Sequence, residues 1–236
     1  MCYVIITCRS LGWTLLSIAV ALIIVTSVVS PYWLIGIPTS YRLDSQNDSL
    51  QQSKKEEFIP TVGIFNRCRK LQKGLSLMKR ENCATFVTGY TDPNDDFPHA
   101  WKAALVFFAL AGLLLSFSMI LSMILAVLSL FVRSFFGKSI FTIAGLVQSI
   151  AGLLSVLGLV IYPAGWGSDR INRLCGEYAN PYIIDRCELG WSFYLCVVGT
   201  VLVFLCSILS IQADHSTTSR KVEEEVLEGK NLICVI

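Results

Sequence analysis

Four long stretches of this chain carry no charged side chain, and they constrain the fold more than any other feature. They cover roughly residues 11–30, 103–132, 139–161 and 190–211. A hydrocarbon layer about 30 Å thick is crossed by about 20 helical residues, because each residue advances a helix by about 1.5 Å. Buried helices of soluble proteins usually have shorter apolar runs with a polar face. The four stretches therefore predict four transmembrane helices.

The composition agrees with a membrane protein. Charged residues make up 15% of the 236 residues, and the mean hydropathy is +0.62. An ordinary soluble domain has about 25% charged residues. The net charge of +2 comes from basic residues interleaved with acidic ones, so no basic face predicts binding to nucleic acid.

The short loop between the second and third helices predicts the orientation. It carries Arg133 and Lys138 and no acidic residue. Short loops with such charges stay in the cytoplasm, whereas a loop of more than about 60 residues is translocated largely regardless of its charge. Both termini are then cytoplasmic and the two longer loops face outward. We expect the plasma membrane, with an endosomal membrane as the alternative.

These arguments divide the chain into nine segments. They are a cytoplasmic N-terminus (1–10), a first helix (11–33), a first extracellular loop (34–101), a second helix (102–132), a cytoplasmic loop (133–138), a third helix (139–163), a second extracellular loop (164–189), a fourth helix (190–211) and a cytoplasmic tail (212–236).

The cysteines support this orientation, because each outer loop contains two of them. Cys68 and Cys83 lie in the first outer loop, and Cys175 and Cys187 lie in the second. Paired cysteines in an oxidising compartment predict disulfides. Four cysteines allow three pairings, of which pairing within each loop is the simplest. Each such bridge would stabilise its loop by about 3 kcal/mol.

Three further residues are candidates for covalent modification. Asn47 lies in the only Asn-x-Ser/Thr sequon of the chain, within the first outer loop, and is a glycosylation candidate. Cys2 and Cys8 lie on the cytoplasmic flank of the first helix, where palmitoylation can occur.

No pattern in the sequence predicts catalysis, a metal site or a cofactor. The chain has two histidines, and Cys-x-x-Cys, phosphate-loop and His-Glu-x-x-His motifs do not occur in it. The four helices contain no acidic or basic residue between their ends, although ion and proton pathways usually show such residues. The sequence therefore favours a protein that is not an enzyme, and a solute pore or transporter is the least favoured function.

The third helix carries a face of small and polar residues. Gly145, Gln148, Ser149 and Gly152 follow each other at helical spacing, and Gln148 is the most polar side chain at mid-membrane. Such a face lets another helix approach closely, and a buried amide can make an interhelical hydrogen bond. We expect packing within the bundle; docking of a partner's helix is the alternative.

The first outer loop resembles the claudin superfamily, whose pattern is Trp, then Gly-Leu-Trp, then two cysteines. Here the pattern is Trp33, then Gly63-Ile64-Phe65, then Cys68 and Cys83. Phe65 departs from the family's second tryptophan, and the stretch between Trp33 and Gly63 is longer than in claudins. We expect the polar insert over residues 39–57 to be the least ordered part of the loop.

Several motifs along the whole chain resemble the lipoma HMGIC fusion partner-like tetraspans, nearest to their second paralogue. They are the N-terminal MCYVIITCRSLGWTLL, then KSIF from Lys138, YPAGWG from Tyr162, LGWSFY from Leu189 and EGKNLIC from Glu228. Tyr162, Pro163, Gly165 and Trp166 are the expected family signature.

The resemblance implies a claudin-like fold: a membrane all-α four-helix bundle with a small disulfide-braced extracellular β-sheet. Most strands would come from the first outer loop and one from the second, with Cys68–Cys83 bracing the sheet. Residues 61–68 and 84–90 are strand-like, and residues 92–95 form a turn.

The resemblance also implies the kind of role. Related tetraspans are auxiliary subunits that bind, traffic or cluster other membrane proteins, including a mechanotransduction complex and an inhibitory neurotransmitter receptor. The expected partners are therefore the lipid bilayer and a channel, receptor or adhesion protein. A claudin-like junction or barrier protein is the alternative.

The cytoplasmic tail offers one more candidate contact. Residues 220–228 could form a short helix that stops at Gly229. The last residues, Ile233 to Ile236, end in an apolar carboxyl terminus that a PDZ-type groove could accept by strand addition.

Overall fold

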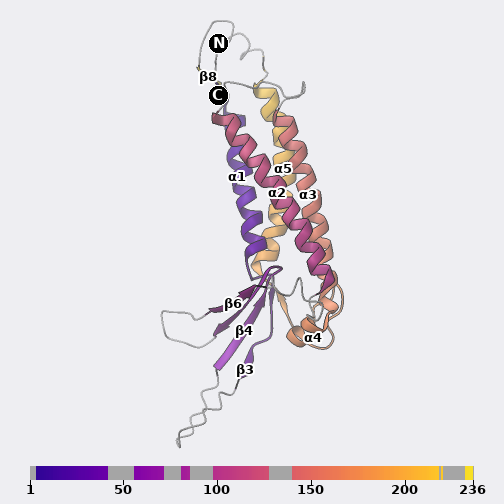
Figure 1. The fold of residues 1–236 in the computed structure, drawn as a ribbon. Helices are drawn as coiled ribbons and strands as arrows, with labels where there is room; N and C mark the ends of the chain where they lie inside the picture. Colours follow the sequence, from indigo (N-terminus) through magenta and orange to yellow (C-terminus); the bar gives the residue numbers. More distant parts are fainter. Residues whose placement is uncertain are drawn as a thin grey trace, which may run out of the picture. The chain divides into compact units, whose positions relative to one another are not determined.

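The computed structural model describes residues 4–41, 56–71, 81–85, 98–127, 140–217, 219 and 232–235. Its four long helices are α1 (Cys8–Val29), α2 (His99–Val127), α3 (Ile140–Ile161) and α5 (Trp191–Thr217), shown in Figure 1. All four are long and apolar enough to cross a membrane, as the sequence predicted.

The chain divides into two compact units, and each unit contains part of every long helix. The helical unit comprises residues 1–25, 106–157 and 196–236, and the sheet unit comprises residues 26–105 and 158–195. We describe the two units separately.

The helical unit is centred on Trp13 of α1. Its ring packs edge-on against Phe141 of α3, with 5.4 Å between the ring centroids, and it lies in a cluster with the buried Ala144 and Ala213. The indole N–H donates to the carbonyl oxygen of Cys206 in α5 at 2.9 Å. One side chain therefore joins three helices and leaves no unpaired donor of its own in the apolar bundle.

The predicted small-residue face of α3 packs inside the bundle. Gln148 Nε2 donates to Ser17 Oγ of α1 at 3.0 Å, and the hydroxyls of Ser149 and Ser207 lie 2.6 Å apart. A Cβ atom added at Gly145 would meet the side chain of Ser210 in α5.

Gly152, the fourth residue of this face, also packs closely against α5. A Cβ added at Gly152 would lie 2.9 Å from the ring of Phe204 in α5. The glycines therefore let α3 and α5 approach closely, so the Gly145–Gly152 face is occupied by this chain's own helices.

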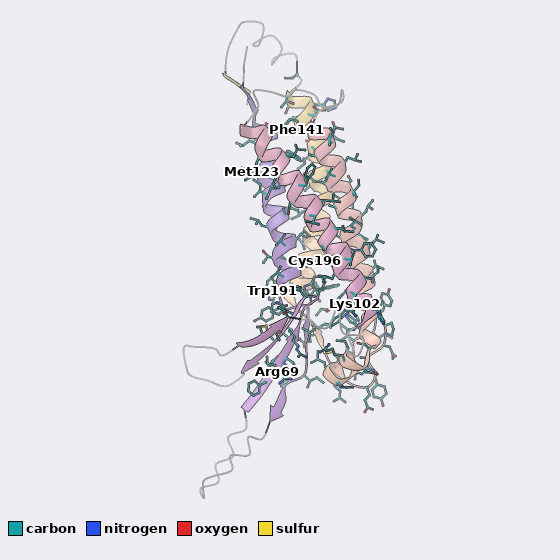
Figure 2. All side chains as sticks on the ribbon, in the orientation of Figure 1. Arg69, Lys102, Met123, Phe141, Trp191 and Cys196 are labelled. Carbon is teal, nitrogen blue, oxygen red and sulfur yellow. A yellow bond between two sulfur atoms is a disulfide. The ribbon has the colours of Figure 1, made fainter. Side chains whose placement is uncertain are left out.

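The outer surfaces of the helices are apolar. Leu15, Leu22, Leu113, Phe117 and Leu153 are all exposed, and Met123 of α2 is labelled in Figure 2 as another example. In water such surfaces would favour aggregation, whereas acyl chains solvate them. The exposure pattern is thus that of lipid-facing helices.

A short two-stranded sheet joins the ends of the chain. β1 (Val4–Thr7) pairs in parallel with β8 (Leu232–Val235), with Val4 opposite Leu232 and Thr7 opposite Val235. The predicted helix over residues 220–228 lies outside the described residues.

The sheet unit contains a six-stranded sheet. Its strands are β2 (Leu34–Ile35), β3 (Thr39–Tyr41), β4 (Glu56–Val62), β5 (Asn66–Leu71), β6 (Glu81–Thr85) and β7 (Glu188–Leu189). The spatial order is β6-β5-β4-β2-β7, with β3 also paired to β4 and all pairs antiparallel. As expected, the second loop contributes one strand, β7.

One strand prediction was wrong in detail. Residues 61–68 are not one strand, because β4 ends at Val62 and the chain reverses, so that Thr61 pairs with Cys68. The polar insert over 39–57, expected to be the least ordered part of the loop, is described only at its two ends, which form β3 and the start of β4 and pair with each other. Of the run 84–90, Ala84 and Thr85 belong to β6, and the rest lies outside the described residues, as does the turn at 92–95.

The last helix extends beyond its predicted end. The hydropathy of the sequence predicts that the fourth helix ends at Ile211, but α5 continues to Thr217. Ala213 is fully buried in the Trp13 cluster, and Thr142 Oγ1 of α3 donates to Asp214 Oδ2 at 3.2 Å. Contacts with other helices thus stabilise the last part of α5, whose sequence is no longer an apolar run. The predicted cytoplasmic loop, residues 133–138, lies outside the described residues.

Substituting Gly145 should destabilise the bundle, because its position against α5 leaves no space for a methyl group. Overpacking of this kind costs about 1–3 kcal/mol. We expect Gly145→Ala to lower the unfolding temperature of the protein in lipid nanodiscs.

Gly112 of α2 provides the control, since a Cβ there would meet nothing within 4 Å. Gly112→Ala should be neutral or stabilise by up to about 1 kcal/mol through helix propensity. Equal unfolding temperatures for the two variants would contradict the packing of α3 against α5.

Candidate recognition surface

Four aromatic residues from the four helix ends form the core of the sheet unit, and we call them the aromatic hub. They are Trp33 after α1, Trp101 in α2, Tyr162 after α3 and Phe193 in α5. The Tyr162 ring stacks on Trp101 at 5.1 Å and meets Trp33 edge-on at 4.9 Å. Phe193 lies 5.7 Å from Trp33 and 6.5 Å from Tyr162. Each such pair contributes about 0.5–1.5 kcal/mol beyond the area it buries.

The indole nitrogens of the hub are both hydrogen-bonded. Trp33 Nε1 donates to the carbonyl oxygen of Ser27 at 2.7 Å, and Trp101 Nε1 donates to that of Tyr162 at 3.1 Å. Carbonyls near the end of a helix lack partners within the helix. The indoles therefore satisfy such groups while their rings fill the core, and Trp33, Trp101 and Tyr162 are fully buried.

The predicted signature residues Tyr162, Pro163, Gly165 and Trp166 form the short helix η2 (Tyr162–Gly167), and all four are buried. Proline near its start suits the first turn of a helix, where a missing N–H costs nothing. A Cβ added at Gly165 would lie 2.5 Å from the indole of Trp101, so no larger residue fits there. The signature therefore shapes the wall of the aromatic hub.

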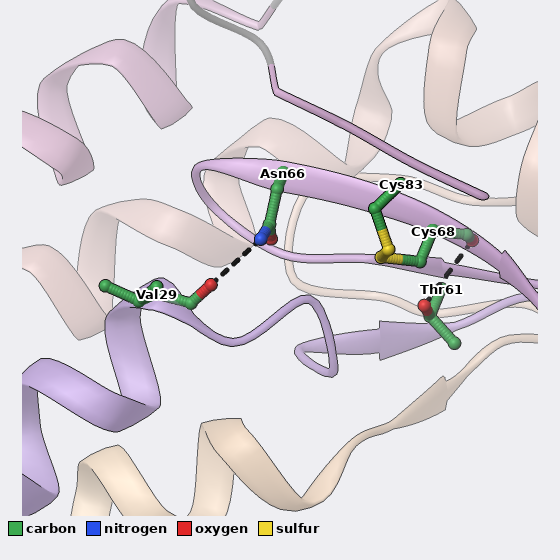
Figure 3. Close-up of a disulfide and its surroundings, with 5 residues drawn as sticks. All are labelled: Val29, Thr61, Asn66, Cys68 and Cys83. Atoms are coloured by element: carbon green, nitrogen blue, oxygen red, sulfur yellow. Dashed lines mark hydrogen bonds between the residues drawn. A yellow bond between two sulfur atoms is a disulfide. The ribbon is translucent and has the colours of Figure 1, made fainter. Parts of the chain in front are cut away.

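The first loop attaches its hairpin to the end of α1. A Cβ at Gly63 would lie 2.6 Å from the carbonyl oxygen of Ser30, so only glycine allows the hairpin turn to approach the helix end. Asn66 Nδ2 donates to the carbonyl oxygen of Val29 at 3.0 Å (Figure 3). Phe65 lies half-buried in the same turn.

Both predicted disulfides are present in the structure. Cys68 of β5 is bonded to Cys83, directly opposite in β6, and Cys175 is bonded to Cys187 in the second loop (Figure 3 shows the first bridge). The first bridge fixes the pairing of the outermost strand of the sheet to its neighbour.

The second loop contains a short helix that we did not predict, α4 (Asp169–Cys175). A signal for it was present: Ser168 and Asp169 are typical of a helix start, and Gly176 is typical of the residue after a helix end. Gly176 has φ 117°, a conformation that favours glycine. Cys175 closes this helix, so the second bridge joins α4 to the residue before β7.

Two of the exposed places in this unit are candidates for contact. Cys83, Ala84 and Thr85 are exposed along β6, which pairs only with β5 among the described residues. The second loop exposes Tyr182 and Ile183 in a turn.

Three predicted modification sites remain to be placed. Cys8 begins α1 with an exposed, free thiol, so its palmitoylation stays a prediction. Cys2 and Asn47 lie outside the described residues.

Removing the Trp33 indole should destabilise the protein far more than removing another tryptophan indole. Trp33→Phe deletes the hydrogen bond to Ser27 and leaves a cavity, with an expected cost of about 2 kcal/mol. Trp191→Phe is the matched control, because Trp191 is 50% exposed while Trp33 is 0% exposed. Thermal unfolding in nanodiscs measures both, and similar losses would show that the hub is not the stabilising core.

Comparisons with known proteins match nearly the whole chain. A family model described as "Lipoma HMGIC fusion partner-like protein" matches residues 9–212. The human LHFPL tetraspan subfamily member 2 protein is 40% identical over the full length of both chains, and the zebrafish member 2a protein is 39% identical over both full lengths. The mouse member 4 protein is 28% identical over 95% of this chain and 80% of its own.

Proposed function

Because this chain belongs to the lipoma HMGIC fusion partner-like (LHFPL) tetraspan family, we propose that it is a non-enzymatic auxiliary or scaffolding subunit. In this role it binds, traffics or clusters another integral membrane protein. The observation that carries the proposal is that the sheet unit combines a stabilised fold with an exposed strand edge. The unit is cross-linked by two disulfides, and the exposed β6 residues Cys83, Ala84 and Thr85 are uncharged.

The polar groups of the helical unit support this role over transport. Gln148 is hydrogen-bonded to Ser17, Ser149 lies within hydrogen-bonding distance of Ser207, and the Trp13 indole is bonded to Cys206. These contacts join α1, α3 and α5 in pairs. The Gln148 amide nitrogen, the Ser149 hydroxyl and the Trp13 indole N–H are therefore engaged in helix packing, which favours packing over a solute path as their role.

We assign the partner contact to the outer edge of β6, where the described residues include no second strand. A strand edge presents unpaired backbone donors and acceptors that an extended segment of another protein can complete. β6 has five residues, whereas β7 at the opposite edge has two. The exposed residues Cys83, Ala84 and Thr85 bring no charge, so they do not oppose pairing.

Capture from living cells tests this proposal. Proximity labelling followed by co-purification should recover one or a few integral membrane proteins with the wild-type chain. Ala84→Lys places a charge on the β6 edge and should reduce their recovery at least severalfold. Glu188→Lys is the matched control at the β7 edge and should leave recovery unchanged.

Two outcomes would contradict the proposal. Recovery of the chain only as monomers or homo-oligomers would count against an auxiliary role. Clustering with itself at cell contacts, together with a changed paracellular resistance, would favour the claudin-like junction protein instead.

The chain's C-terminus is a second candidate contact, for a PDZ-type protein. β8 is held by β1 alone among the described residues, and a two-stranded sheet is marginally stable. A groove that adds a strand could therefore replace β1 or bind the other edge. A chain lacking Ile236 is the arm of the capture experiment that tests this contact, and unchanged recovery of PDZ proteins would exclude it.

We propose the plasma membrane as the location, with both termini in the cytoplasm. Each of the two outer loops contains one disulfide, and the loops lie on the same side of the membrane because two spans separate them. Disulfides persist in an oxidising compartment, which favours the extracellular side for both loops. The basic residues Arg133 and Lys138 favour the same orientation.

Glycosylation tests this orientation. If the first loop is translocated, glycosidase treatment should increase the gel mobility of the wild-type chain, and Asn47→Gln should migrate like the treated protein. As a negative control for the opposite face, a sequon placed in the tail after Thr217 should remain unmodified. Modification of the tail sequon would invert the orientation.

A further inference from the structure

The second loop contains an exposed segment without charge, which we call the interface turn (residues 178–184). It lies between the acidic residues Glu177 and Asp185. Tyr178 is 77% exposed, and Tyr182 and Ile183 are each 59% exposed. Large apolar side chains that are exposed next to one another outside a membrane span usually mark a contact surface.

Tyr182 lies alongside the last turn of α3. Its backbone N–H donates to the carbonyl oxygen of Pro163 at 3.1 Å, and its phenol hydroxyl donates to that of Val160, also at 3.1 Å. Pro163 follows the end of α3, and Val160 belongs to the final turn of the helix. The ring therefore runs back along the helix by about one turn, toward the membrane span.

The neighbouring surface of α3 is lipid-facing. Val160 is 52% exposed, although it belongs to a candidate membrane span. The 22 residues of α3 cover about 33 Å, close to the thickness of a hydrocarbon layer. Val160 therefore lies near the boundary between acyl chains and headgroups, and Tyr182 extends that apolar surface from the helix to the loop.

The backbone holds Tyr182 in a conformation that side chains seldom adopt. Its φ is 66°, and glycine or asparagine is usual there. Reciprocal hydrogen bonds between Asn180 and Ile183, at 3.1 and 2.9 Å, close the turn, and Pro181 packs against Gly167. These contacts fix the backbone of the turn, in which Tyr182 and Ile183 are both exposed.

We propose that the interface turn lies in the headgroup–acyl boundary of the bilayer and anchors the second loop to lipid. Tyrosine suits this layer, because its ring is apolar and its hydroxyl is polar. Because none of the seven residues of the turn is charged, the turn can enter the headgroup–acyl boundary without the free-energy cost of desolvating a charge. The surface is continuous with that of α3, so its occupant is lipid rather than a partner protein.

Nitroxide accessibility tests the proposal on the full-length chain in phosphatidylcholine vesicles. Cys2, Cys8 and Cys234 are replaced by serine, and a spin label is attached through Ile183→Cys. Oxygen concentrates in the acyl layer and a nickel chelate concentrates in water, so their collision rates report depth. We expect the oxygen-to-nickel ratio at Ile183 to be severalfold higher than at a matched Glu177→Cys label, whose native carboxylate requires water.

Two variants distinguish the contribution of the Tyr182 ring from that of the backbone conformation of the turn. Tyr182→Asn tolerates the positive φ but removes the ring, and it should move the Ile183 label toward water. Tyr182→Phe retains the ring and should keep the label at its original depth.

Two results would overturn the proposal. One is equal nickel accessibility at residues 183 and 177. The other is protection of the Ile183 label from both reagents, which would mean that protein rather than lipid covers the turn. Neither result bears on whether β6 binds a partner, so this test is independent of the proposed function.

Discussion

The ring of Tyr162 is the interaction on which the sheet unit depends. It stacks on Trp101 and meets Trp33 edge-on, and its carbonyl oxygen accepts the Trp101 indole N–H. Through this one residue, segments that begin or end four different helices share a single buried core. The strands attach directly to it, because Leu34 of β2 follows Trp33 and pairs with both β4 and β7. Loss of the hub would therefore release both loops at once, whereas loss of one disulfide would release only one.

The helices depend on a different constraint. In lipid the backbone must satisfy its own hydrogen bonds, so an uncharged run of sufficient length becomes a helix whatever its detailed sequence. This is why hydropathy alone located all four spans. It also explains the error at the end of α5, where Ala213 and Asp214 continue the helix through contacts with α1 and α3 that hydropathy does not register.

The sheet unit was less predictable, for a physical reason. The cysteines and Trp33 could be identified because their chemistry is specific, and pairing within each loop was the simplest of the three alternatives. The reversal after Val62, by contrast, depends on the close approach of Gly63 to Ser30, far away in the sequence. The conformation of Tyr182 likewise depends on bonds to Pro163 and Val160 that no local pattern encodes. Strands of two or three residues, such as β2 and β3, are defined by their neighbours more than by their own residues.

Most residues that hold the sheet unit together differ from the residues that it exposes, and Cys83, which is exposed and also forms a bridge, belongs to both sets. The hub, the η2 signature and the bridges are buried or covalently fixed, so a substitution there changes stability before it changes any contact. Ala84 and Thr85 of β6 and the exposed positions of the interface turn face no such constraint, apart from the positive φ at Tyr182. Lipid contact by the interface turn would then fix the second loop against the bilayer, and β7, which this loop contributes to the sheet, would be fixed with it.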